Sequence, residues 1–146
     1  MDIAAGIIAA IIGIALLAIA LAHLLWSVGF LWPIRDEKLL ARSVIGAPGI
    51  EHMPPKYQSF GVFLLALAAC VITFSVADHT SGGLWLTLLA LLAAVVFIAR
   101  GALGYTAGWA ARRPVEPFRT LDRKNYSPLS LAIGVGLLVL VVLRLL

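Results

Sequence analysis

Four long runs of apolar residues constrain this chain more than any other feature of its sequence. They lie near Ile3–Trp32, Ser59–Ala77, Leu84–Trp109 and Leu129–Leu146. A helix rises about 1.5 Å per residue, so a run of roughly 20 residues can cross the ~30 Å hydrocarbon core of a membrane. AVILMFWYC make up 62% of the 146 residues and DEKR only 12%, which excludes a soluble domain. The sequence therefore predicts an all-α, polytopic membrane protein.

The four runs and the two long segments between them account for nearly the whole chain. We therefore expect one four-helix transmembrane bundle over residues 1–146, with loops at about 33–58 and 110–128. The stretch "AIALA" at residues 18–22 resembles the cleavage site of a secretory signal, but no basic segment precedes it. We expect the first run to be a permanent span. The single cysteine, Cys70, cannot form an internal disulfide.

The basic residues of the loops predict the orientation of the bundle. Nine of them fall in the two long loops, namely Arg35, Lys38, Arg42, Lys56, Arg112, Arg113, Arg119, Arg123 and Lys124. The opposite side carries Asp2, Asp78 and His79, and its only basic residue is Arg144. Because Lys and Arg in short loops favour the cytoplasm, both termini should be extracytoplasmic and both long loops cytoplasmic. This charge predicts contact with anionic membrane lipid, and the sequence has no aromatic and basic strip typical of a nucleic-acid partner.

Arg100 is a charged residue within the third apolar run. If Trp85 and Trp109 mark the two membrane interfaces, Arg100 lies about 13 Å inside the cytoplasmic one. One interpretation is a side chain that snorkels to the headgroups. The other is a side chain that faces the bundle interior, where it pairs with a carboxylate or binds an anionic or carbonyl group. Asp122 is the acid nearest the membrane at this level, so we expect it to be the partner.

Other polar side chains are predicted at the same cytoplasmic level as Arg100. His23 and Trp26 are three residues apart and share a face near the end of the first span. Tyr105 follows Arg100, while Asp122 and Tyr126 precede the fourth span. The predicted ligand-binding residues are therefore His23, Trp26, Arg100, Tyr105, Asp122 and Tyr126.

Three local patterns predict helix ends and helix packing. Gly104 and Gly108 form a G-x-x-x-G step, which favours close packing within the chain or, alternatively, a homodimer. In "NYSPL", Ser127 is predicted to cap the fourth helix, with Pro128 in its first turn. The stretch "DEKLLARSVIG" predicts a short interfacial helix that ends at Gly46.

Three segments carry a resemblance to a known family. The segments are "HLLWSVGFLWP", "ARGALGYTAGW" and "FRTLDRKNYSPLSLAIG". They resemble signature segments of a four-span bacterial membrane family, domain of unknown function 3995. The matching residues are His23, Trp26, Arg100, Gly101, Phe118, Leu121, Asp122, Tyr126, Ser127, Pro128 and Leu129. The resemblance implies a fold, a shared site and a bacterial inner membrane, but no activity. Ser130 stands where we expect the family to favour cysteine, which argues against a thiol mechanism there.

Several kinds of chemistry find no support in the residues. His23, His52 and His79 lack the spacing of metal ligands, so neither a metal nor a cofactor is predicted. No motif supports a Ser-His-Asp triad or a phosphate-binding loop. The interiors of the spans contain no Asp or Glu, which argues against a proton-coupled cation exporter.

Three functional hypotheses remain open, and the sequence does not decide whether the protein is an enzyme. The first is a protein that binds an amphiphilic, lipid-like molecule, with its polar head at Arg100, His23 and Tyr126. The second is a small intramembrane enzyme that acts on a lipid, isoprenoid or quinone-like substrate, in which His23 or Asp122 moves a proton. The third is a structural accessory subunit whose polar cluster holds the bundle together.

The predicted orientation can be tested by cysteine labelling. In a Cys70→Ala background, Ser81→Cys should react with a membrane-impermeant maleimide added to intact cells, because this turn is expected outside. Arg113→Cys should react only after the membrane is opened. Protection of position 81 in intact cells, with labelling from the cytoplasmic side, would contradict the orientation.

Overall fold

The chain folds into helices only, over the residues that the structure describes. This computed structural model describes residues 3–78 and 82–146, so His79 lies outside the described residues. The elements are α1 (Ile3–Ser27), α2 (Glu37–Val44), α3 (Lys56–Ala77), α4 (Gly83–Leu103), α5 (Ala107–Arg112), α6 (Phe118–Leu121), η1 (Asp122–Tyr126) and α7 (Ser127–Leu145). The helices α1, α3, α4 and the continuous stretch Phe118–Leu145 are long and apolar enough to cross a membrane. The predicted all-α fold with four membrane-capable helices is confirmed.

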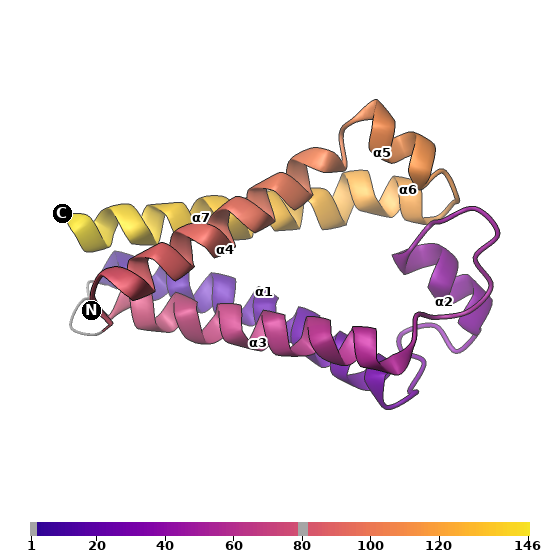
Figure 1. Cartoon of the computed structure of the whole chain (residues 1–146), viewed down its shortest axis with the longest axis horizontal. Coiled ribbons are helices and arrows are strands. Elements are labelled where there is room, and N and C mark those ends of the chain that lie inside the picture. Colours follow the sequence, from indigo (N-terminus) through magenta and orange to yellow (C-terminus); the bar gives the residue numbers. More distant parts are fainter. Residues whose placement is uncertain (1–2, 79–81) are drawn as a thin grey trace.

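The long helices pack as two pairs. α1 packs mainly against α3, and α4 packs mainly against α7. Figure 1 shows the two pairs close together at the end that holds the chain termini and apart at the other end, where α2, α5 and α6 lie. We call this second end the loop end. The short helices α2, α5 and α6 and their connecting segments, which carry most of the polar residues, lie at this end.

The hydrophobic core lies in the half of the bundle nearer the termini. Its buried members are Ala5, Ala9, Ile12, Leu16, Ala69, Cys70, Val76, Ala77, Ala90, Ala94, Ile133, Leu137, Leu140 and Val141. Many of them are alanines, which let helix backbones approach closely where lipid provides no hydrophobic driving force between helices. The outward faces carry exposed Leu, Ile and Val side chains, as expected for helices that contact lipid.

Two helices end earlier than the apolar runs predict. α1 ends at Ser27 rather than near Trp32, and Gly29 follows with a positive φ of 85°. α4 ends at Leu103 rather than near Trp109, since Thr106 caps the separate helix α5 by accepting a hydrogen bond from Trp109 N–H. The predicted continuous helix from Leu84 to Trp109 is therefore wrong, and Arg100 lies in the last turn of α4.

The prediction that Ser127 caps the fourth helix is also wrong. The chain is already helical from Phe118, and Ser127 lies within the continuous stretch α6, η1 and α7. Ser127 Oγ donates to Asp122 Oδ1 at 3.2 Å, so the hydroxyl serves a side chain rather than a free backbone N–H. The serine and proline resemble a helix start in sequence because Pro128 cannot continue an ordinary α-helical ladder.

A π-helical turn accommodates Pro128. Within η1, Ser127 N–H donates to Asp122 O, five residues earlier. In the same register, residue 128 would donate to Arg123 O, but proline has no N–H. Tyr105 Oη donates to Arg123 O instead, at 3.2 Å. The phenol of Tyr105 thus satisfies the carbonyl that the proline leaves without a backbone donor.

Two glycines at the loop end of α4, Gly101 in its last turn and Gly104 just after it, pack within the chain. A Cβ on Gly101 would lie 2.6 Å from the Leu131 side chain and 2.8 Å from Ser127 O, and a Cβ on Gly104 would overlap Ser127 Oγ. Gly108 belongs to α5 and has open space around it. The close contact is therefore made by Gly101 and Gly104. A homodimer through Gly104 and Gly108 stays a prediction.

Alanine at positions 104 and 108 should have opposite effects on stability. Gly104→Ala should lower it by about 1–3 kcal/mol, because the new methyl group must displace the buried Ser127. Gly108→Ala has room and should be neutral or stabilise α5 by up to ~1 kcal/mol. Thermal unfolding midpoints in one detergent would compare them. Equal midpoints for the two variants would contradict the packing of α4 against η1 and α7.

Candidate functional site

A buried carboxylate, Asp122, organises the polar side chains of the loop end. Its side chain accepts hydrogen bonds from three elements. Oδ1 accepts from Arg100 Nη2 at 2.6 Å and from Ser127 Oγ at 3.2 Å, and Oδ2 accepts from Trp109 Nε1 at 2.8 Å. The residue is only 1% exposed. The donors come from α4, α5 and α7, so this one side chain joins three helices.

The Arg100–Asp122 ion pair is the pairing that the sequence predicts. The guanidinium of Arg100 turns toward Asp122, while its side chain is 33% exposed. Arg100 Nη1 also lies 3.5 Å from Ser127 Oγ. A charge near the membrane needs an anion, water or acceptors, and Asp122 provides the anion. The partner predicted for Arg100 is therefore confirmed.

Trp109 lies beside two arginines. Arg100 Cζ is 5.1 Å and Arg113 Cζ 5.5 Å from its ring centroid, both within cation–π range. Phe118 continues the aromatic row, with its centroid 6.5 Å from that of Trp109 and 5.9 Å from that of Tyr126. This row forms an aromatic wall beside the polar cluster.

The helix α2 is fixed to this cluster by its carboxyl end. Tyr126 Oη donates to Ser43 O at 3.0 Å, and Arg113 Nη1 donates to Ile45 O at 3.1 Å. Val115 N–H donates to Gly46 O at 3.2 Å. Ser43 O is among the last carbonyls of α2, which have no partner within the helix, and Ile45 and Gly46 follow the helix directly, so these three donors satisfy groups that would otherwise need water. α2 ends at Val44 and Gly46 follows with a φ of 65°, which confirms the predicted short helix.

A pocket of about 300 Å³ lies between α2, the start of α3 and the segment from α4 to α6. It is lined by Val44, Ile45, Pro54, Gln58, Arg100, Trp109, Arg113 and Phe118. We call it the arginine pocket, since its charged lining residues are two arginines. Asp122 neutralises Arg100, but Arg113 forms no ion pair with any residue that the structure describes. The arginine pocket therefore has one uncompensated positive charge.

The six predicted ligand-binding residues fall into separate groups. Arg100 and Asp122 form the ion pair, while Tyr105 and Tyr126 each donate to a backbone carbonyl as described above. His23 Nδ1 lies 2.8 Å from Ile19 O, and its ring meets Trp26 edge to face at 4.7 Å. Among residues 3–78 and 82–146, no hydrogen bond, ion pair or ring contact joins His23 or Trp26 to Arg100 or Asp122.

The sequence does not identify most of the residues that line the arginine pocket, and among its polar and aromatic contacts it does not identify Gln58, Trp109, Arg113 or the neighbouring Ser127 as ligand-binding residues. The pattern indicates Trp109 only as a marker of the membrane interface, Arg113 as a loop charge and Ser127 as a helix cap. A tryptophan near a membrane arginine was an available signal, because indole and guanidinium attract each other. Ser127 had no such signal, because residues five apart lie on different sides of an ordinary α-helix, and only the π-helical turn η1 brings Ser127 next to Asp122.

Comparison with known proteins identifies a family but not an activity. A family model described as "Protein of unknown function (DUF3995)" matches residues 16–137, which include all six predicted site residues. The searches of curated proteins and of solved structures each found no match.

The ion pair can be tested by a double-mutant cycle. Arg100→Leu and Asp122→Asn should each destabilise the protein by about 3–5 kcal/mol, because each leaves a charged or polar partner buried without its counterpart. The double variant should recover part of that loss. Unfolding in detergent would measure it, with Arg112→Leu, an exposed arginine of α5, as the control. Losses that simply add in the double variant would contradict a direct interaction.

Proposed function

Since this chain belongs to the DUF3995 family, whose description assigns no function, we propose a function from its own geometry. The protein binds an amphiphilic, lipid-like molecule with an anionic headgroup in the arginine pocket. We place the protein in a bacterial inner membrane with the loop end in the cytoplasm; the four membrane-capable helices support the membrane location, and the nine Lys and Arg residues of the two long loops support the orientation. The single observation that carries the proposal is the uncompensated Arg113 beside the Arg100–Asp122 pair.

The charges of the arginine pocket favour a ligand with one negative charge. Arg100 and Arg113 are its charged lining residues, and Asp122 behind Arg100 cancels one of them. Arg113 already donates to Ile45 O through Nη1, and a guanidinium has five N–H donors, so donors remain for an anion. The side chain of Gln58 adds amide donors at the same opening. A single carboxylate or phosphodiester would balance this lining.

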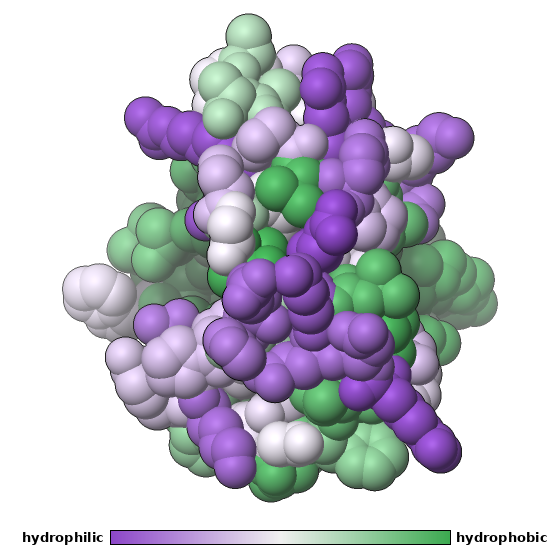
Figure 2. All heavy atoms as spheres, turned by 90° about the vertical axis from the view of Figure 1, so that its right-hand side faces the viewer, coloured by the Kyte–Doolittle hydropathy of each residue, from purple (hydrophilic) through white to green (hydrophobic). Residues whose placement is uncertain are grey.

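The position of the pocket favours an amphiphile over a soluble anion. Val44, Ile45, Pro54 and Phe118 give it apolar walls. Gln58 of α3 and Arg100 of α4 show that both helix pairs, which separate at this end (Figure 1), contribute to its lining. Figure 2 shows hydrophilic side chains gathered over the loop end, with hydrophobic ones at its sides. A charged head at the pocket with an apolar tail among the helices would match this distribution.

The enzymatic hypothesis receives less support from the arrangement. A proton-transfer mechanism would need His23 or Asp122 to reach a substrate. Asp122 is buried and accepts from three donors, while His23 is engaged with Ile19 O at a separate place. Asp122 is better placed to fix Arg100 and Trp109 around the pocket than to exchange a proton with a ligand.

Binding can be tested with two lipids of different headgroup charge. Native mass spectrometry of the purified protein should show preferential binding of phosphatidylglycerol, a monoanion, over phosphatidylcholine. Arg113→Gln should weaken phosphatidylglycerol binding by about tenfold, as expected when a hydrogen bond to a charged group is lost. Arg112→Gln removes the same charge from the neighbouring position and should leave binding unchanged.

A second variant separates binding from the role of Arg113 in holding α2. Gln58→Trp keeps Arg113 and places a bulky ring at the pocket lining, so it too should weaken phosphatidylglycerol binding, by about tenfold or more, at unchanged thermal stability. Full binding by Gln58→Trp, or an equal loss in Arg112→Gln, would reject the arginine pocket as the site.

A further inference from the structure

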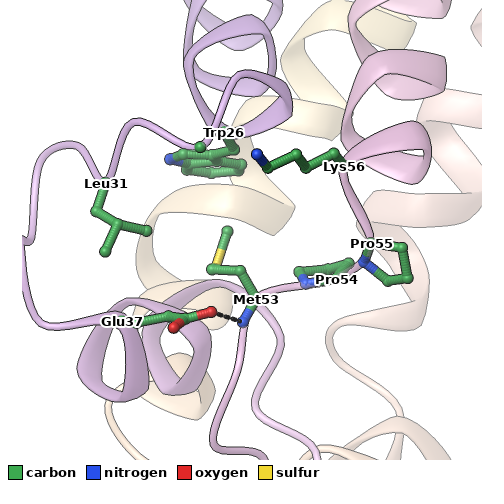
Figure 3. A pocket seen from close by; sticks show the side chains of 8 residues that line it. Trp26, Leu31, Glu37, Met53, Pro54, Pro55 and Lys56 are labelled. Atoms are coloured by element: carbon green, nitrogen blue, oxygen red, sulfur yellow. Dashed lines mark hydrogen bonds between the residues drawn. The ribbon is translucent and has the colours of Figure 1, made fainter.

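A second pocket lies at the amino end of α2, and it differs from the arginine pocket in charge. Its volume is about 330 Å³, and it lies below the loop ends of α1 and α3 and above α2 (Figure 3). Trp26, Leu31, Met53 and Pro54 provide its apolar walls. Its charged lining residues are Lys56 and Glu37, so its net charge is zero. We call it the zwitterion pocket.

Lys56 provides the positive charge of this pocket. It is the first residue of α3, and it forms no ion pair with any described residue. Figure 3 shows its side chain extending toward the ring of Trp26. A Cβ on Gly29 would lie 3.1 Å from Lys56 Nζ, so the glycine, at a φ of 85°, leaves the ammonium its space. The ammonium is therefore available to an anionic group of a ligand.

Glu37 provides the negative charge on the opposite wall. Its Oε1 accepts from Met53 N–H at 3.1 Å, and its Oε2 lies 3.5 Å from His52 Nδ1. A carboxylate has about four lone-pair sites, so it can accept further hydrogen bonds from a ligand. The hydrogen bond from Met53 N–H, helped by His52, lowers the pKa of Glu37 below its ordinary value, so this carboxylate is charged at neutral pH, as an ordinary glutamate is.

The two charges lie at different distances from the membrane-capable helices. Trp26 and Lys56 belong to the ends of α1 and α3, whereas Glu37 belongs to α2, which lies beyond those ends (Figure 3). In a zwitterionic phospholipid the phosphate is nearer the acyl chains, and the ammonium is farther out. The order of charges in the pocket is complementary to that order.

We propose that the zwitterion pocket binds the headgroup of a phospholipid with a primary ammonium, such as phosphatidylethanolamine. Lys56 contacts the phosphate, and Glu37 accepts hydrogen bonds from the ammonium. The segment after α1 gives the glycerol and the first acyl carbons an apolar surface. Its exposed apolar side chains are Val28, Phe30 and Trp32. This site is separate from the arginine pocket and goes beyond the function proposed for it.

The test uses the whole protein in detergent and lipids added one at a time. Native mass spectrometry should show binding of phosphatidylethanolamine in preference to phosphatidylcholine, whose trimethylated ammonium cannot donate to Glu37. Soluble O-phosphoethanolamine should bind at least about tenfold more weakly, because it lacks the acyl chains. Lys56→Gln and Glu37→Gln should each weaken phosphatidylethanolamine binding by about tenfold and leave phosphatidylglycerol binding unchanged.

The chain offers matched controls for both charges. Lys38 and Glu51 form an exposed ion pair in the same loop, with Nζ and Oε1 2.6 Å apart, and neither lines the pocket. Lys38→Gln and Glu51→Gln should keep phosphatidylethanolamine binding. Glu37→Gln retains an oxygen that can accept from Met53 N–H, so its thermal stability should stay near that of the wild type.

Three results would overturn the proposal. They are equal binding of phosphatidylcholine and phosphatidylethanolamine, equal binding of free phosphoethanolamine, and equal losses in the control and pocket variants. If the zwitterion pocket fails these tests, the effect of Arg113→Gln on phosphatidylglycerol binding still tests the arginine pocket independently.

Discussion

The hydrogen bonds to the buried carboxylate of Asp122 are the interaction on which the loop end of this protein depends. A buried carboxylate is stable only where its oxygens accept hydrogen bonds. For Asp122, α4, α5 and α7 each supply one donor. The consequence reaches beyond the pair with Arg100. Trp109 is held by the same carboxylate, so α5 cannot move away from η1 without leaving a buried acceptor unpaired. The aromatic row and the arginine pocket both rest on that fixed position.

The helix α2 is a wall shared by two pockets of different charge. Its carboxyl end receives donors from Tyr126, Arg113 and Val115, next to the arginine pocket. At its amino end, Glu37 accepts from Met53 N–H, next to the zwitterion pocket. Pro54 lines both. A short helix held at both ends separates the two pockets, so each pocket has its own set of charged lining residues.

The sequence was sufficient to predict the helical architecture and the Arg100–Asp122 ion pair. Apolar runs of about 20 residues specify membrane-capable helices by length alone, and the cost of a lone charge pointed to Asp122 as the partner of Arg100. It was insufficient where the outcome depends on which helices pair. His23 and Trp26 are predicted at the same depth in the membrane as Arg100. However, α1 pairs with α3 whereas α4 pairs with α7, and the two pairs separate at this end. Ser127 was misread because a Ser-Pro step normally begins a helix, and nothing local indicates that the helix has begun nine residues earlier, at Phe118.

The π-helical turn at Asp122–Tyr126 determines the rotational phase between the two parts of the last helix. A π turn contains one residue more than an α turn, and each residue of an α-helix corresponds to about 100° of rotation about the axis. If one residue were removed from this turn, the α register would be restored, and everything before it would rotate by about that angle relative to α7. Asp122 would then point away from Arg100, although every residue of the cluster would still be present. The extra residue is therefore what aims the carboxylate.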